Sequence, residues 1–119
     1  MQELLETKWK STRVGTPPLT DTESDHFLSK LENGWVVVNS EMNKLTKTFK
    51  FPNFAKALAF INKVGEFAEE KNHHPDLTLT WGKASVTIYT HRIKGLAEMD
   101  FVYAAHVEKI YQDNFGSVQ

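Results

Sequence analysis

The chain of 119 residues contains no cysteine, which excludes disulfides, thiolate metal sites and cysteine nucleophiles. It has no run of about 18 apolar residues that could cross a membrane, and residues 1–10 lack the continuous apolar stretch of a signal peptide. With 14 basic and 15 acidic residues the net charge is −1, so no overall attraction to nucleic acid or membranes is expected. We therefore expect a soluble, cytoplasmic protein without a direct nucleic-acid or membrane partner.

What the chain does contain fits one compact domain, because 40% of its residues are apolar and 24% are charged. Residues 1–19 show no clear periodicity and end in Gly15-Thr16-Pro17-Pro18, a turn-forming sequence. This predicts an extended N-terminal arm over 1–19, from which Trp9 can dock on the core, followed by a single domain over 20–119.

The residue patterns of the domain predict the order helix, two strands, helix, two strands, helix. The expected elements are a helix from a capping box at Thr20 to before Gly34, strands at 35–38 and 45–51, a long helix capped by Asn53, strands at 77–81 and 86–88, and a helix at 98–113. Two hairpins and three helices favour an α+β fold, in which an antiparallel four-stranded sheet carries helices packed on one face.

The long helix after Asn53 has one predicted apolar face. That face is made of Phe54, Ala57, Leu58, Ile61, Val64, Gly65 and Ala68. Phe60 and Phe67 fall outside this arc and are seven residues apart, so they nearly superpose on the helix surface. They predict an exposed apolar patch and favour self-association, the alternative being a wider buried face.

Three of the five histidines are predicted to share one small volume. Two lie in Asn72-His73-His74-Pro75, and His91 follows the second hairpin. A two-residue turn at Gly82 and Lys83 would place His74 opposite His91, with Cβ atoms roughly 4.5–5.5 Å apart. Because the unperturbed pKa of histidine is near neutrality, the group is a candidate proton-transfer or metal site.

Zinc is the less favoured interpretation of this group. Zinc takes three or four converging ligands, whereas adjacent strand residues such as His73 and His74 point to opposite faces. The chain offers no cysteine and no carboxylate nearby other than Asp76. We assign no role to His26 and His106, which are isolated on predicted helices.

The sequence resembles a known family, the pterin-4a-carbinolamine dehydratases. The residues that carry the resemblance are Glu69, His73, His74, Pro75, Trp81, His91 and Asp100. The likeness runs from about Thr20 to Tyr111 and includes Gly34-Trp35 and the segment from Thr90 to Leu96.

The resemblance implies a small α+β protein that forms homodimers or homotetramers and needs no metal or other cofactor. It also implies an enzyme, a hydro-lyase that converts 4a-hydroxytetrahydropterin to quinonoid dihydropterin for recycling to an aromatic amino acid hydroxylase. The implied catalytic residues are His73, His74 and His91. The implied substrate-binding residues are Trp35, Pro75, Thr90, Arg92 and Asp100.

The reaction suits imidazole groups, since the 4a-hydroxyl must gain a proton as it leaves and a ring nitrogen must lose one. We expect His73 or His74 to be the acid and His91 the acceptor, an allocation that the sequence leaves open. Trp35 either covers the pterin ring or lies in the core, and Asp100 either orients a histidine or stabilises a helix N-terminus. Glu69 fits a solvated helix residue better than a pocket residue.

The alternative function is a non-catalytic one, because some relatives in this family act as transcription coactivators. A pterin-binding or interaction protein would use the same fold. The chain also departs from the family pattern, with Asn72 where some members have an acid, Met99 where some have a base, and Ala97 in place of a Ser or Thr cap. The missing cap is expected to cost about 1 kcal/mol.

Overall fold

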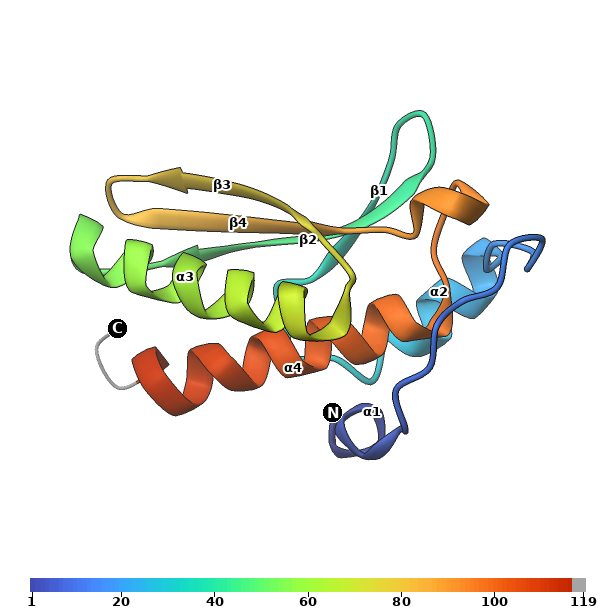
Figure 1. The fold of residues 1–119 in the computed structure, drawn as a ribbon, viewed down its shortest axis with the longest axis horizontal. Helices are drawn as coiled ribbons and strands as arrows, with labels where there is room; N and C mark the ends of the chain where they lie inside the picture. The colour runs from blue at the N-terminus through green and yellow to red at the C-terminus, as the bar shows by residue number, and fades with distance from the viewer. Residues whose placement is uncertain (117–119) are drawn as a thin grey trace.

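The computed structural model describes residues 1–116. Within them the chain forms a four-stranded antiparallel sheet with helices on one face, which confirms the predicted α+β fold (Figure 1). The strands are β1 (Val36–Asn39), β2 (Asn43–Lys50), β3 (Asp76–Thr80) and β4 (Lys83–Ile88), in the order β1-β2-β4-β3. The helices are α1 (Gln2–Glu6), α2 (Asp21–Leu28), α3 (Phe54–Lys71) and α4 (Glu98–Phe115), with a 3₁₀ turn, η1, at His91–Ile93.

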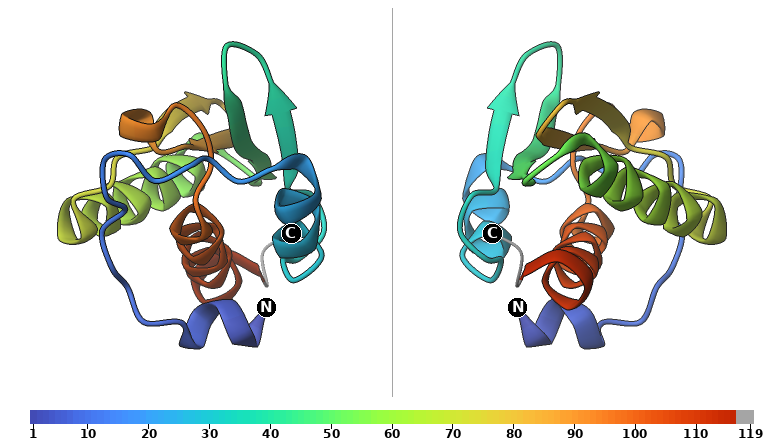
Figure 2. Two further views of the ribbon diagram at one scale, coloured as in Figure 1. Left: turned by 90° about the vertical axis from the view of Figure 1, so that its right-hand side faces the viewer. Right: turned by 90° about the vertical axis from the view of Figure 1, so that its left-hand side faces the viewer.

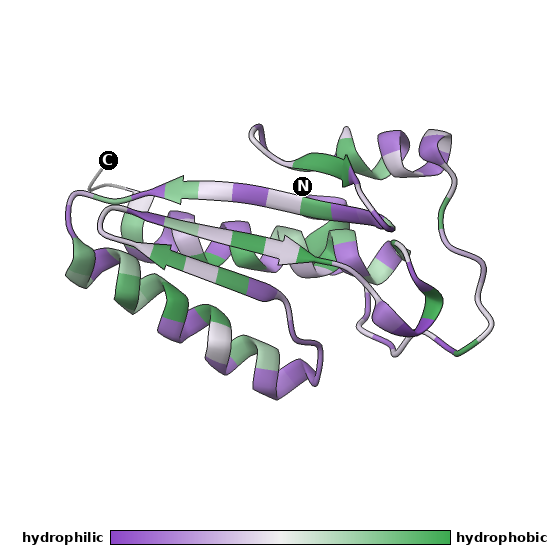
Figure 3. Ribbon diagram, turned by 90° about the horizontal axis from the view of Figure 1, so that it is seen from above, coloured by the Kyte–Doolittle hydropathy of each residue, from purple (hydrophilic) through white to green (hydrophobic). Residues whose placement is uncertain are grey.

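The two faces of the sheet differ in polarity because side chains alternate along each strand. Figure 3 shows this alternation along β2 and β4. Leu45, Phe49 and Val86 point toward the helices and are at most 2% exposed. On the other face, hydroxyl groups pair across the strands, for example Thr46 with Thr87 at 2.9 Å. The sheet therefore has one face in the core and one polar outer face.

Side-chain caps begin α2 and α3 where the sequence predicts them. Thr20 accepts a hydrogen bond from the backbone of Glu23, whose carboxylate accepts one from the backbone of Thr20. Asn53 accepts from the backbone N–H of Lys56. Helix α2 is shorter than expected. It ends at Leu28, whereas the sequence predicted an end just before Gly34.

The predicted apolar face of α3 is correct only in part: Ala57, Val64 and Ala68 are buried as predicted, but the buried face is shifted toward Phe60. Phe60 is completely buried, and Phe67 is half-buried against Tyr103, with ring centroids 4.8 Å apart. Phe54 and Leu58, assigned to the core, are instead 44% and 38% exposed. The core is rich in aromatic rings, and Phe60 packs among them. The helix is therefore rotated about its axis relative to the predicted face.

The N-terminal arm is not wholly extended, which corrects a second expectation. Residues Gln2–Glu6 form α1, which packs on α4 through the buried Leu4. From α1 the arm rises past the end of α3 and crosses to α2 (Figure 2). The backbone N–H of Leu19 donates to the carbonyl of Leu96 at 2.8 Å, which fixes the far end of the arm.

The second hairpin forms, but in a different register from the predicted one. Thr80 pairs with Lys83, so the turn consists of Trp81 and Gly82. Gly82 stays in the turn and Trp81 takes the place of Lys83, while the Gly82 carbonyl accepts a hydrogen bond from the backbone of Phe51 at 2.9 Å. The ladder ends at Asp76, and the predicted cross-strand pairing of His74 with His91 is therefore wrong.

Within residues 1–116, no helix is both long enough and apolar enough to cross a membrane.

Candidate active site

The centre of the candidate site is a histidine–carboxylate pair. Nε2 of His73 lies 2.8 Å from Oδ1 of Asp100, which is completely buried in the first turn of α4. His73 reaches this position because α3 ends at Asn72, which has left-handed backbone angles (φ 51°, ψ 43°) that asparagine tolerates well. The backbone N–H of His73 then donates to the carbonyl of Ala68 at 3.1 Å.

The second carboxylate oxygen of Asp100 accepts two further hydrogen bonds. Oγ1 of Thr90 donates at 2.7 Å and the backbone N–H of Ala97 at 2.8 Å. Asp100 therefore orients a histidine and also stabilises the start of α4, so the two roles considered for it occur together. A buried carboxylate with three donors is held rigidly, and it fixes the ring orientation of His73.

The segment after β4 is folded into a closed loop that brings Thr90 to Asp100. The backbone N–H of Thr90 donates to the carbonyl of Gly95 at 2.9 Å. Lys94 has left-handed backbone angles (φ 53°, ψ 49°), and His91 starts the 3₁₀ turn inside this loop. His91 is exposed, with its ring centroid 6.3 Å from that of Tyr89.

The three histidines have different surroundings. His73 is 19% exposed at its side chain and contacts Asp100, whereas the side chain of His74 is 55% exposed and contacts the carboxylate of Glu69. Glu69 is itself solvent-exposed, as expected for a helix residue, but it does have this partner. The contacts of His91 are with Tyr89, on the polar side of the sheet.

A small hollow lies beside His73. It has a volume of about 30 Å³, and its lining comes from the arm, the end of α3, the segment after β4 and the start of α4. The lining residues are Trp9, Lys10, Ser11, Thr12, Lys71, Asn72, His73, Thr90, Arg92 and Met99. The structure thus brings His73, Thr90 and Arg92 together around one space, with Asp100 directly behind them.

Trp35 does not belong to this hollow, although it was among the expected substrate-binding residues. It is 4% exposed, and its indole N–H donates to the Glu108 carboxylate at 2.9 Å. Lys47 forms an ion pair with the same carboxylate, which joins β2 to α4. Trp35 is therefore a core residue in this fold, and Pro75, half-buried, does not line the hollow either.

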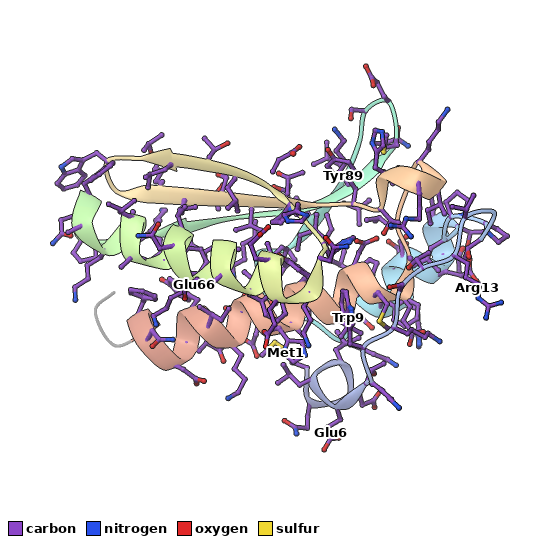
Figure 4. All side chains as sticks on the ribbon, viewed as in Figure 1. Met1, Glu6, Trp9, Arg13, Glu66 and Tyr89 are labelled. Carbon is purple, nitrogen blue, oxygen red and sulfur yellow. The ribbon has the colours of Figure 1, made fainter. Side chains whose placement is uncertain are left out.

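The arm contributes site residues that the sequence did not reveal. Trp9 lies beside α4, near the end of α3 (Figure 4), with its ring centroid 5.9 Å from that of His73. The carbonyl of Thr12 accepts a hydrogen bond from Arg92 at 3.2 Å. The available signal was the one aromatic residue of the arm, which indicated docking without indicating where.

Comparison with known proteins identifies the fold and the family. The sequence model described as pterin 4 alpha carbinolamine dehydratase matches residues 17–110. The chain belongs to the pterin-4-alpha-carbinolamine dehydratase family. The family predicted from the sequence is thereby confirmed.

Individual relatives agree with this assignment. A protein of Alkaliphilus metalliredigens that carries the provisional name pterin-4-alpha-carbinolamine dehydratase is 45% identical over 109 residues, covering 92% of this chain and 96% of the relative. The crystal structure of a transcriptional coactivator/pterin dehydratase from Brucella melitensis superposes with a TM-score of 0.71 at 31% identity, covering 78% of this chain and 97% of that one.

A more distant solved structure shares the fold alone. It is a pterin dehydratase-like protein described as a RuBisCO assembly factor in the alpha-carboxysome. Its TM-score is 0.57 at 21% identity, covering 66% of this chain and 90% of that chain. Pterin dehydratase folds therefore occur with more than one described role, and activity has to be judged from the site.

Within residues 1–116, no three histidine, aspartate or glutamate side chains are grouped so that they could hold a metal ion.

Proposed function

We propose that this chain dehydrates 4a-hydroxytetrahydropterin to quinonoid dihydropterin by histidine acid–base catalysis. The observation that carries the proposal is the His73–Asp100 pair, formed by residues at the family positions named above. A carboxylate with no exposure that accepts from an imidazole is a common way to set the tautomer and orientation of a catalytic histidine.

The pair assigns a chemical state to His73. Because Asp100 accepts a hydrogen bond at Nε2, that nitrogen carries a proton, and Nδ1 is the nitrogen that exchanges a proton with substrate. In the proposed step Nδ1 also carries a proton, which it gives to the substrate while Nε2 stays bonded to Asp100. His73 is therefore the proposed acid, and His91, which lies in an exposed turn, is the proposed acceptor.

The proposed step is a loss of water assisted by one acid and one base. His73 protonates the 4a-hydroxyl, the C4a–O bond breaks, and the hydroxyl leaves as water. The lone pair of the neighbouring ring nitrogen forms the new C=N bond, and the proton of that nitrogen passes to His91. Each positioned proton transfer is typically worth about 10²–10⁴ in rate.

The substrate is proposed to cover the exposed part of His73, on a surface that we propose His74 and His91, both exposed, also reach. The hollow of about 30 Å³ is far below the roughly 300 Å³ of a small-ligand pocket, so it is not the pterin site itself. Pro75, between His74 and β3, and Arg92 are the proposed substrate contacts on this surface.

The direct test is the decay rate of freshly made 4a-hydroxytetrahydropterin with and without the chain. Acceleration by the wild type, its loss in a His74→Ala, His91→Ala double variant and in His73→Gln, and its retention in a His26→Ala control would support the proposal. No acceleration by the wild type would refute it. Pterin binding without acceleration would instead favour the non-catalytic interpretation.

Self-association and a functional link to a hydroxylase are further parts of the proposal. Phe54 and Leu58 are exposed on α3, so the apolar surface that a second copy would cover is proposed to include them and not Phe60 and Phe67. Sedimentation equilibrium of the wild type and of a Phe54→Ser, Leu58→Ser variant would test this, and an unchanged mass would contradict the involvement of this face.

A further inference from the structure

The N-terminal arm is fixed at both ends and touches the site in its middle. Leu4 of α1 is buried against α4, and Leu19 is hydrogen-bonded to Leu96. Between these anchors, Trp9 and Thr12 are the partly buried residues of the segment 8–18, whose other residues are exposed. The arm therefore makes its inward contacts at two defined points, both next to the His73–Asp100 pair.

Trp9 packs against the hydrophobic core and also contacts the ring of His73. The two rings meet in a T-shaped arrangement with centroids 5.9 Å apart. Tyr103 of α4 contacts the same imidazole at 5.2 Å and Trp9 at 6.2 Å. His73 is thus in contact with two aromatic rings while its Nε2 is bonded to Asp100.

These contacts restrict a motion that the Asp100 hydrogen bond alone leaves open. A hydrogen bond to Nε2 fixes one atom of the imidazole, but the ring can still swing about that contact, which bends the hydrogen bond and redirects Nδ1. Aromatic rings packed at edge-to-face geometry oppose this motion, because the ring would have to break both contacts. Tyr103 is fully buried in the core, whereas Trp9 belongs to a separate segment.

Trp9 also lines the hollow beside the pair, which has a volume of about 30 Å³. Thr12 lines it further along the arm, where its carbonyl accepts a hydrogen bond from Arg92. Removing the indole would leave His73 more exposed to bulk water.

We propose that Trp9 is a positioning residue that holds His73 in the orientation and tautomer set by Asp100. Trp9 lies outside residues 17–110, the part of the chain that the family model matches, so this role is supplied by the arm of this chain. The catalytic consequence rests on the proposed dehydratase function, whereas the effect on the imidazole itself does not.

The experiment compares Trp9→Ala, Trp9→Phe and an arm control, Val14→Ala, whose side chain is 79% exposed. The ¹⁵N signals of the His73 ring, assigned by their loss in His73→Gln, report the tautomer without substrate. At a pH where the ring is neutral, we expect the proton on Nε2 in the wild type and in the control, and averaged ring nitrogens in Trp9→Ala; the acid of the proposed step is the same ring with a second proton on Nδ1. The ring signals of His74 and His91 serve as internal references.

Kinetics of the same proteins give the second readout. Trp9→Ala is expected to lower kcat by at least about tenfold while KM stays within about twofold, because misplacing a catalytic group costs rate rather than binding. Trp9→Phe, which keeps an aromatic edge, is expected to recover most of kcat and the single tautomer. It also keeps the test informative if Trp9→Ala fails to fold.

Two results would overturn the proposal: unchanged His73 nitrogen signals in folded Trp9→Ala, or a Trp9→Phe variant as defective as Trp9→Ala. If the wild type does not accelerate dehydration, the proposed function fails, and the nitrogen signals alone then decide on Trp9. The two failures are therefore distinguishable.

Discussion

The substitution Asp100→Asn tests the centre of the site most directly. The second oxygen of Asp100 accepts from both Thr90 and the backbone N–H of Ala97, so the amide oxygen of asparagine has to take that place. The amide NH₂ then faces Nε2 of His73. Two donors cannot share that contact, so His73 must become neutral with its proton on Nδ1.

The expected loss of rate follows from this change of tautomer. In the variant Nδ1 keeps its proton, but a neutral imidazole is a far weaker acid than the imidazolium that the proposed step uses, so one proton-transfer contribution of about 10²–10⁴ in kcat would be lost. The free energy of unfolding should fall by about 1–3 kcal/mol, because the three hydrogen bonds to the carboxylate are replaced by neutral ones. The variant is therefore expected to be folded and nearly inactive.

The assay is the single-turnover rate of 4a-hydroxytetrahydropterin decay, measured beside a urea unfolding curve. The matched control is Asp113→Asn on the same helix, whose carboxylate is 54% exposed and pairs with Lys109 at 3.1 Å. The control should keep its rate and lose less than about 1 kcal/mol. A folded Asp100→Asn protein with the rate of wild type would refute the role of the His73–Asp100 pair.

Three further predictions concern the fold. Phe60→Ala should lower the free energy of unfolding by about 3–5 kcal/mol, whereas Phe54→Ala on the exposed side of α3 should cost under about 1 kcal/mol in urea unfolding; equal losses would contradict the helix orientation. Burial lowers the pKa of His106, so the folded state binds this proton less readily than the unfolded chain and loses stability as pH falls through about 6.5. His106→Gln should therefore lose less stability than wild type between about pH 7.5 and about pH 5, and an identical pH dependence would disprove this. A Cβ on Gly95 would lie 2.7 Å from Cβ of Pro18, so Gly95→Ala should destabilise by about 1–3 kcal/mol. It should also speed tryptic cleavage in the arm, and unchanged cleavage would show that this contact does not hold the arm.

Much of the fold is encoded in local patterns and could be predicted from them. The caps at Thr20 and Asn53 depend on one side chain and the backbone three residues later, so sequence spacing is sufficient. The same holds for strand alternation, which set the inner and outer faces of the second hairpin correctly even though its register was wrong. A shift of two residues moves the pairing without exchanging the faces.

The errors have a common cause, since each depends on a contact between distant segments. The hairpin register is set by Phe51, which is hydrogen-bonded to the carbonyl of Gly82. The rotation of α3 is set by Phe60, which packs against Phe49 with ring centroids 4.8 Å apart. Residue spacing alone predicts which side chains share a helix face. It does not show that one large aromatic contact will determine which face is buried.

The site was predictable in its residue types but not in its arrangement. The family resemblance selected His73 and Asp100, and the structure adds that they form one hydrogen-bonded pair. The family resemblance did not distinguish Trp35, a core residue paired with Glu108, from residues at the site. The arm could not be placed, because Trp9 has no periodic neighbours that would indicate its target.

Asp100 links folding to the proposed chemistry, and this determines which variants can separate the two. Its carboxylate contacts the segment after β4, the start of α4 and the residue that follows α3, so removing it loosens all three. His73→Gln leaves the bonds from Thr90 and Ala97 intact and still offers an amide donor to Asp100, but it removes the titrating nitrogen. A loss of rate in His73→Gln without a loss of stability would therefore show chemistry alone, which no substitution of Asp100 can do.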